Sequence, residues 1–439
     1  MTNEREHSVL VDPAKCIGCV ACAKACPTQA IRVRGSLAVV KSELCTDCGA
    51  CIAACPHEAM QARTSTPAEL RKFAYTVAIP SLTLYGQFGR EVHPTQVLHA
   101  LTQIGFHEAY DMSWMCEMVA QATDALLSES RGQWPKLSVT CPAIVRLIQI
   151  RYPELLPHLV PIESPRELAA KLLRRRLVAE RGLAPEEIGI FFITPCSAIM
   201  NSIIAPVGLE QSYFDGAFAI NELYAQLVAA IRADGVAWHR DDQLSPGGLL
   251  WASAGGERGG MRNHNTMAVS GVHDVLYVFD HIEAGRFQSV DFIEAYMCPD
   301  GCVSGGLTLE GRYATQRNIE QVRRRIGKQS PVKEEKVRSL LREHFFDLEE
   351  EIRARAIRPV AQDLRQAIAL KRERTELLGK LPRRDCGACG APDCAALAED
   401  VLRGEAAIDD CVFLKLARVE EILRARGAPD GPPREEGRP

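Results

Sequence analysis

Residues 16–27 read CIGCVACAKACP, and residues 45–56 repeat the pattern as CTDCGACIAACP. In each stretch, three cysteines follow one another at three-residue steps, and a fourth cysteine stands directly before a proline. Four thiols this close in sequence can wrap around one iron–sulfur cluster, and the proline stops the last turn from continuing as a helix. The repetition therefore predicts a small duplicated iron–sulfur module, which we assign to residues 9–62.

The repeated pattern resembles that of bacterial ferredoxins, in which the fourth cysteine of each run binds the cluster of the other run. This resemblance implies two [4Fe–4S] clusters. One would be held by Cys16, Cys19, Cys22 and Cys55, and the other by Cys45, Cys48, Cys51 and Cys26. Zinc also binds paired Cys-x2-Cys thiolates and is the alternative, but the duplication and the third cysteine of each run favour iron and sulfide.

The remaining cysteines of the 17 in the chain form two further groups and one single residue. A dispersed group contains Cys141, Cys196, Cys298 and Cys302, and a compact group contains Cys386, Cys389, Cys394 and Cys411. We expect the single residue, Cys116, to be a buried structural thiol. The sequence shows no stretch typical of a signal peptide or a membrane span. We therefore expect a cytoplasmic protein, in which grouped thiols stay reduced and bind metal.

The composition sets the size and the class of the protein. With 439 residues, 46% of them hydrophobic, the chain can bury a substantial core and form more than one domain. The formal net charge of −4, with both signs interspersed, argues against a nucleic-acid partner. Between residues 72 and 325, apolar runs at 75–79, 137–140, 188–194 and 275–279 alternate with helical patterns at 166–180 and 221–234. This alternation predicts strands of a parallel sheet joined by crossover helices.

The C-terminal part is expected to be helical and to carry another iron–sulfur site. A polar stretch at 64–69 is expected to be a linker, and residues 332–380 form one apolar stripe at helical spacing, with a kink at Pro359. The compact cysteines at 381–420 resemble a small [4Fe–4S] domain of anaerobic redox proteins, with zinc as the alternative. Gly387 and Gly390 would let the backbone approach the cluster. We expect the tail, residues 427–439, to be disordered.

Three segments in the middle of the chain read SVTCP at 138–142, PCSAI at 195–199 and EAYMCPDGCVSGG at 294–306. They resemble the three signature segments of [FeFe]-hydrogenases. The resemblance implies an α/β fold: a ferredoxin-like module, a two-lobed parallel-sheet domain, a helical linker and a small α-helical iron–sulfur domain. It also implies that Cys141, Cys196, Cys298 and Cys302 hold a third [4Fe–4S] cluster of four in the chain. Cys302 would bridge this cluster to a two-iron subsite with CO and cyanide ligands.

Three residues depart from the pattern of catalytic family members. Thr140 stands in place of a proton-relaying cysteine, and a hydroxyl is far less acidic than a thiol. Ile199 stands in place of a lysine that would make a charge-assisted hydrogen bond to cyanide. Tyr296 stands in place of a methionine beside the subsite. Residues 142–149, residues 212–217 and the C-terminal domain resemble the sensory branch of the family, so we expect low hydrogen activity.

Taken together, the sequence predicts a multi-cluster redox protein that passes electrons, or a hydrogen-dependent signal, to a soluble partner. The partner would be a kinase, a phosphatase or a flavoprotein. One alternative is a slow hydrogenase that oxidises H2 reversibly, and another is an electron-transfer protein that lacks the two-iron subsite. We expect His57 to be a surface residue. We expect residues 255–260 to be a flexible turn rather than a phosphate loop, since they lack the Lys-Ser/Thr of such a loop.

Overall fold

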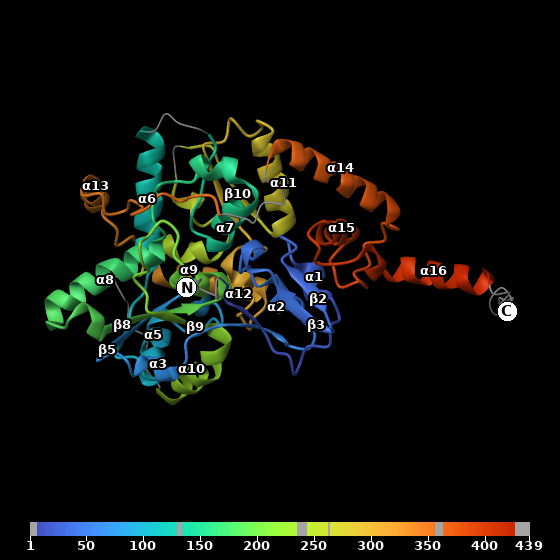
Figure 1. Ribbon diagram of the computed structural model, residues 1–439. Helices are drawn as coiled ribbons and strands as arrows, with labels where there is room; N and C mark the ends of the chain where they lie inside the picture. Colours follow the sequence, from blue (N-terminus) through green and yellow to red (C-terminus); the bar gives the residue numbers. More distant parts are fainter. Residues whose placement is uncertain (1–6, 130–133, 235–243, 262–263, 356–362, 426–439) are drawn as a thin grey trace, which may run out of the picture. The chain divides into compact units, whose positions relative to one another are not determined.

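The structure is a computed structural model that describes residues 7–129, 134–234, 244–261, 264–355 and 363–425. The chain divides into two compact units (Figure 1). Unit 1 comprises residues 1–10, 42–53 and 61–356, and unit 2 comprises residues 11–41, 54–60 and 357–439. Three short elements straddle the division: β1 (Val9–Val11), α2 (Ala50–Ala54) and β4 (Met60–Ala62).

The larger sheet of unit 1 has four parallel strands in the order β6-β5-β8-β9. Their bounds are β5 (Tyr75–Pro80), β6 (Glu108–Ala109), β8 (Ile188–Thr194) and β9 (Gly216–Ala219). All seven residues of β8 are buried, as is typical of a parallel strand that is covered on both faces. Helices lie on either side of this sheet (Figure 1). The predicted strands at 75–79 and 188–194 are confirmed.

A second parallel sheet in unit 1 has three strands in the order β10-β11-β7. These are β7 (Lys136–Leu137), β10 (Thr266–Ser270) and β11 (Phe292–Tyr296). The two sheets give unit 1 the two-lobed parallel arrangement that the sequence predicts. Cys141 and Cys298 follow strands of this sheet, and Cys196 follows β8 of the other. Ligands in such folds bind beyond the carboxyl ends of the strands, which is where these cysteines lie.

The other helices of unit 1 connect and cover the strands. Their bounds are α3 (Pro67–Leu70), α4 (Leu82–Tyr85), α5 (Pro94–Gln103), α6 (Ser113–Glu129), α7 (Pro142–Arg151), α8 (Pro165–Arg181), α9 (Ser197–Ile204), α10 (Ile220–Asp234), α11 (Val272–Glu283), α12 (Arg312–Ile326) and α13 (Glu334–Arg342). The predicted helices at 166–180 and 221–234 are confirmed. The stretch at 64–69 is partly helical, because Thr66 and Glu69 form a capping box at the start of α3.

Two predictions about unit 1 are wrong. Residues 275–279 form part of α11 instead of a strand, because Val275, Phe279 and Ile282 recur at helical spacing and share one buried face. Residues 137–140 are strand only as far as Leu137.

The predicted helix at 332–380 is also interrupted. Helix α13 ends at Arg342, where His344 takes the left-handed conformation (φ 55°). The amide of Phe345 donates to the Leu340 carbonyl and that of His344 to the Leu341 carbonyl, a Schellman motif that terminates the helix. The chain up to residue 355 is not helical, and helix resumes in α14 (Leu364–Lys380). Pro359 and residues 427–439 lie outside the described residues.

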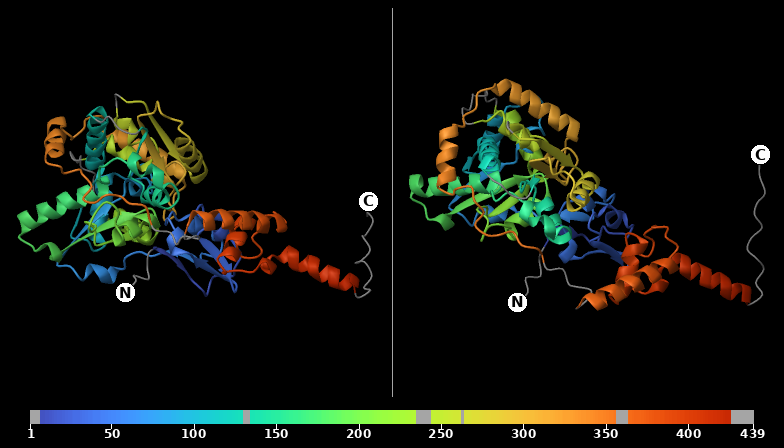
Figure 2. Two further views of the ribbon diagram at one scale, coloured as in Figure 1. Left: turned by 45° about the horizontal axis from the view of Figure 1, so that its top comes forward. Right: turned by 90° about the horizontal axis from the view of Figure 1, so that it is seen from above.

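Unit 2 combines an antiparallel hairpin and a short helix from the N-terminal part of the chain with helices from the C-terminal part. The hairpin is β2 (Ile31–Arg34) and β3 (Leu37–Val40), and the helices are α1 (Ala21–Ala25), α14, α15 (Cys394–Leu402) and α16 (Val412–Ala425). A small apolar core gathers around Leu381, Ala396 and Leu397. Helix α16 extends away from α15 in both views of Figure 2. Among the described helices, none has the length and apolar character needed to cross a membrane.

Candidate redox centre

The structure brings the four dispersed cysteines together in unit 1. Cys141 is the N-cap of α7 and Cys196 the N-cap of α9, whereas Cys298 and Cys302 lie in the turn after β11. Burial raises the pKa of the Cys298 thiol well above its usual value, and the neighbouring thiols of Cys196, Cys141 and Cys302 add to the shift. Bound iron removes this cost, because a coordinating thiol is deprotonated outright. The four residues therefore fit a metal cluster.

A buried arginine lies beside these thiols. Arg166, on α8, is 9% exposed and lowers the pKa of Cys141 and Cys302 through its charge, against the larger, opposite effect of burial. Its guanidinium donates to the Thr140 carbonyl (3.4 Å) and to Ser202 Oγ (3.2 Å). The Nε of Arg166 has no hydrogen-bond partner among the described residues. An unpaired buried N–H is costly. The charge of Arg166 also lowers the pKa of Glu163 and Glu167, against the larger effect of burial, so its charge is shared between these carboxyl groups and the thiols.

Thr140, which the sequence analysis singled out, makes a hydrogen bond to a buried carboxylate. Its Oγ1 donates to Glu257 Oε2 (3.2 Å), and Ser138 Oγ donates to the same oxygen (2.5 Å). Burial, and then repulsion from Glu294, raise the pKa of Glu257. A carboxyl group that retains its proton near neutral pH can give and take protons next to Thr140.

The glycine-rich stretch at 255–260 surrounds the second buried carboxylate. Gly255 N and Arg258 N donate to Glu294, at 3.1 and 3.0 Å. Burial raises the pKa of Glu294 above its ordinary value. Because these backbone donors already bind a carboxylate of the chain itself, they are not free to bind a phosphate. Glu257, Glu294 and Arg166 were not among the residues predicted for the site, although Glu294 is the first residue of the third signature segment.

The other singled-out residues are buried. Ile199 is 6% exposed and packs in the main core, and Tyr296 donates from its hydroxyl to the Trp251 carbonyl (3.3 Å). Cys116 is buried on α6, as predicted. Burial raises the pKa of Cys116 well above its usual value, and the nearby charges of Asp111, Glu257 and Cys302 raise it further. Cys116 therefore lies near the central cysteines, without belonging to the predicted set.

Part of the N-terminal module adjoins the central cysteines within unit 1. Cys45, Cys48 and Cys51 belong to this unit, and the charge of Cys48 contributes to the raised pKa of Cys298. Asp47 fixes this segment: its carbonyl accepts from Ser197 Oγ (2.7 Å), and its carboxylate pairs with Arg146 (3.3 Å). Ser197 directly follows Cys196. Cys26, the fourth member predicted for this set, belongs to unit 2.

Unit 2 contains the other N-terminal set. Cys16, Cys19, Cys22 and Cys55 line one hollow, so the structure brings the fourth cysteine of the second run to the first run. Burial raises the pKa of Cys22 to about 11, and the other three thiols contribute through repulsion. His57 is exposed, as predicted, and also lines this hollow.

The compact C-terminal cysteines line a second hollow in unit 2, formed in part by Cys386, Cys389, Cys394 and Cys411. Gly387 and Gly390 have φ of 79° and 83°, which favours glycine at both positions. Within the described part of the chain, no three His, Cys, Asp or Glu side chains are placed to hold a single metal ion.

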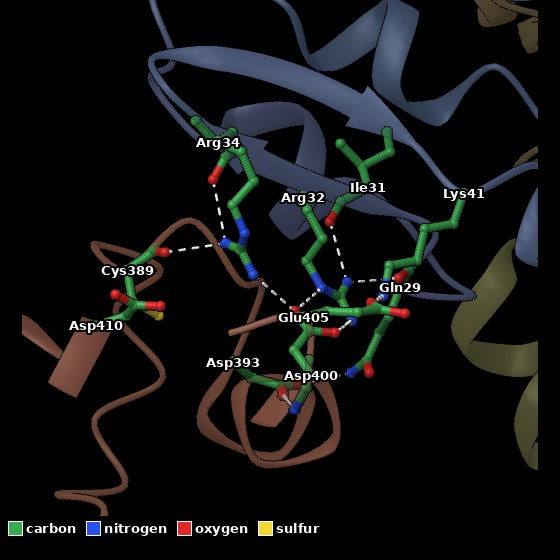
Figure 3. Close-up of polar contacts among 12 residues, drawn as sticks. Gln29, Ile31, Arg32, Arg34, Lys41, Cys389, Asp393, Asp400, Glu405 and Asp410 are labelled. Atoms are coloured by element: carbon green, nitrogen blue, oxygen red, sulfur yellow. Dashed lines mark hydrogen bonds and ion pairs between the residues drawn. The ribbon is translucent and has the colours of Figure 1, made fainter. Parts of the chain in front are cut away.

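A buried ionic cluster in unit 2 joins α15 to the hairpin and to Lys41, which follows it (Figure 3). Asp400 on α15 has a side chain only 1% exposed and pairs with Arg32 (2.5 Å) and Arg34 (2.9 Å) of the hairpin and with Lys41 (2.9 Å). Burial alone would raise the pKa of Asp400, but the hydrogen bonds from Arg32 and Lys41 hold it below its usual value.

Strand β2 also contacts the backbone of the C-terminal cysteine segment. Arg34 donates to the Cys389 carbonyl (3.1 Å), and Val33 N donates to the Gly390 carbonyl (2.7 Å). A Cβ atom on Gly390 would lie 2.0 Å from the Val33 carbonyl oxygen, so only glycine permits this approach. The C-terminal cysteine segment is therefore packed directly on the first half of the N-terminal module.

Comparisons with known proteins match three parts of the chain. The model described as iron only hydrogenase large subunit, C-terminal domain, matches residues 74–207 and 252–306. A 4Fe-4S dicluster domain matches residues 8–56, and a domain whose description names an Fe-S cluster matches residues 381–413.

Curated relatives agree with these matches. The periplasmic [Fe] hydrogenase large subunit of Nitratidesulfovibrio vulgaris is 31% identical over 214 residues, which cover 44% of this chain and 51% of that protein. Iron hydrogenase 1 of Clostridium pasteurianum is 24% identical over 258 residues, 48% of this chain and 45% of that protein. The chain therefore spans about half the length of these relatives.

A solved structure shows the same fold. A variant of the [FeFe]-hydrogenase HydA1 from Chlamydomonas reinhardtii superposes with a TM-score of 0.53 at 14% identity, covering 66% of this chain and 98% of that one. At this identity the likeness concerns the fold alone.

Proposed function

Since the chain is an iron–sulfur protein related to the [FeFe]-hydrogenases, we propose that it carries electrons between its central cysteine set and a soluble redox or signalling partner. The observation that supports this most strongly is the adjacency of the cysteine sets within each unit. A [4Fe–4S] cluster, when bound at such a set, supplies one-electron storage. The cytoplasm keeps this many thiols reduced, so a cytoplasmic location is part of the proposal.

The residues around the central set support an electron route through Cys48. The Asp47 contacts with Ser197 and Arg146 fix the segment that carries Cys48 beside Cys196 and Cys298. A buried ion pair with a matched hydrogen bond holds such a segment in one position. Electron transfer between two clusters requires a fixed distance between them, and these contacts fix the segment of Cys48 relative to the central cysteines.

Within unit 2, the contacts favour electron transfer from one cysteine set to the other in sequence. Asp400 and Gly390 hold the C-terminal cysteines against the hairpin that follows Cys16, Cys19 and Cys22. Electrons that enter or leave at the C-terminal set would then pass through the first N-terminal set, instead of using a separate exit. We propose that the C-terminal domain is the contact point for the partner.

The central site combines features that favour slow proton chemistry over fast hydrogen turnover. Thr140 offers a hydroxyl, which is a poor acid, but it is hydrogen-bonded to Glu257, whose pKa is raised. Ile199 cannot donate a hydrogen bond, whereas the unpaired Nε of Arg166 can. Cys141, Cys196, Cys298 and Cys302 would hold a [4Fe–4S] cluster, and Arg166 would neutralise an anionic two-iron group next to it. This supports a sensory or slowly turning role, and the slow hydrogenase remains the second candidate.

Electron transfer through Cys48 can be tested directly. Anaerobically purified protein is reduced and then mixed rapidly with oxidised methyl viologen, and cluster oxidation is followed by absorbance. The Cys48→Ser variant should lose the fast oxidation of the central cluster. Cys116→Ser, which removes a buried thiol outside the four sets, is the matched control and should behave as the wild type. Equal rates in Cys48→Ser and the wild type would refute the route.

A further inference from the structure

Unit 1 contains a cavity that the redox function does not use. Its volume is about 390 Å³, within the range of small-molecule sites. It lies between α6, α8 and α13, near the carboxyl end of β5, where α/β folds place ligands. Its walls are largely apolar and include Ile79, Trp114, Met118, Leu172, Leu173 and Leu340.

Three cationic side chains also line this cavity: Arg176, Lys333 and Lys336. The lysines have no ion pair to any described residue. Arg176 lies over the Tyr110 ring, 4.6 Å from its centroid, and its Nε is buried without a hydrogen-bond partner. Glu180, one turn further along α8, forms an exposed ion pair with this Nε at 3.6 Å, which is longer than a hydrogen bond.

One carboxylate, that of Asp111, lines the cavity as well, but it is already satisfied. It accepts hydrogen bonds from the Tyr85 hydroxyl (3.0 Å), from Ser113 N (2.7 Å) and from Ser113 Oγ. The groups left to recognise a ligand are therefore cationic, and the rest of the wall is apolar. Such a site matches a molecule with an apolar body and one anionic end.

We propose that this cavity binds a small amphipathic carboxylate, with its alkyl or aryl part against α6 and α8 and its carboxylate near Arg176 and Lys336. The carboxylate would supply the hydrogen bond that the Arg176 Nε lacks, and the apolar body would cover the side chains of Trp114 and Leu173. Neither contact involves the cysteine sets, so this site is independent of the proposed electron route.

Octanoate, octanol and octylamine form a matched series of probes for isothermal titration of the anaerobic protein. The expected result is binding of octanoate, at least about tenfold weaker binding of octanol, and no binding of octylamine, because one charge-assisted hydrogen bond separates the first two. Equal affinities for octanoate and octanol, or no octanoate binding, would overturn the proposal.

Two variants locate the site. Lys336→Glu should weaken octanoate binding about tenfold or more, because it reverses a charge at the cavity. Arg338→Glu makes the same change on the same helix at a residue that pairs with Glu334 and does not line the cavity, so it should retain full affinity. Leu173→Phe should also weaken binding by filling the space. Similar losses in Lys336→Glu and Arg338→Glu, with unchanged cluster absorbance, would mean that octanoate binds elsewhere.

Discussion

At the scale of single residues, the central site is defined by what surrounds the cysteines. Thr140 donates to a buried carboxylate, and Arg166 keeps one N–H unpaired beside the thiols. These neighbours could not be found from the sequence, because Glu257 and Arg166 come from segments far from the signature cysteines. Only their burial in the folded chain distinguishes them from other charged residues. The cysteines themselves were identifiable because the segments around them resemble the signature segments of the family.

Thr140→Cys should raise hydrogen turnover, because a thiol in hydrogen-bond reach of Glu257 is a better proton relay than a hydroxyl. Positioned proton transfer contributes about 10²- to 10⁴-fold to catalysis, so an increase of at least about tenfold is expected. Hydrogen evolution from reduced viologen, by protein matured with the two-iron subsite, measures the effect. Thr140→Val serves as the control that removes the hydroxyl and should lower activity. Hydrogen activity that stays undetectable in all forms would exclude the slow hydrogenase.

A second residue-scale prediction concerns Glu163, which lies near Arg166 and Glu167. Burial, and then repulsion from Glu167, raise its pKa to about 7. Between about pH 4.3, the usual pKa of a glutamate, and about pH 7, the folded protein holds a proton on Glu163 that the unfolded chain has released. The free energy of unfolding therefore falls as pH rises through this range. Glu163→Gln should remove this loss and raise Tm more at about pH 8 than at about pH 5.

The control for this experiment is Glu350→Gln, which makes the same substitution at an exposed residue. It should shift Tm equally at both pH values. If Glu163→Gln also shifts Tm equally at both, the carboxyl of Glu163 is not protonated in the folded protein at the lower pH.

At the scale of elements, the apolar pattern locates many helices and strands, but it does not always determine their type or where they end. β8 is an uninterrupted apolar run and matches its predicted bounds, whereas 275–279, an apolar run of similar character, belongs to α11. Short apolar runs do not distinguish a buried strand from a buried helix. The end of α13 was missed because its apolar stripe continues through Phe345, although the Schellman motif there turns the backbone away from the helix axis.

Docking of α15 on the hairpin of unit 2 should depend on Asp400. Asp400→Asn would leave Arg32, Arg34 and Lys41 close together without the buried countercharge, and breaking such a buried pairing costs roughly 3–5 kcal/mol. Hydrogen exchange measured by mass spectrometry should show faster exchange of the α15 amides. Glu405→Gln removes a half-exposed partner of Lys41, and exposed pairs contribute about 0–1 kcal/mol, so it should leave α15 protected. Unchanged exchange in Asp400→Asn would contradict the anchoring role.

At the scale of the whole molecule, folding brings cysteines from distant parts of the sequence together. The expectation that Cys55 joins Cys16, Cys19 and Cys22 came from the resemblance to ferredoxins, and the structure places these four around one hollow. The contact between the C-terminal cysteines and the first N-terminal set could not be predicted, because it depends on Asp400, Arg34 and Gly390. Asp400 and Arg34 are not distinguishable in sequence from surface charges, and Gly390 was expected to approach the cluster rather than the hairpin.

The number of clusters and their coupling within unit 2 can be measured by a redox titration of the anaerobic protein, followed by electron paramagnetic resonance and paired with iron and zinc analysis. We expect about sixteen iron atoms per chain, as four [4Fe–4S] clusters require, and about eighteen in protein that also carries the two-iron group. We also expect broadened signals, from spin coupling between the C-terminal cluster and its neighbour, that sharpen in Asp400→Asn. Zinc in place of iron at the C-terminal cysteines, or signals that remain magnetically isolated in the fully reduced wild type, would contradict these expectations.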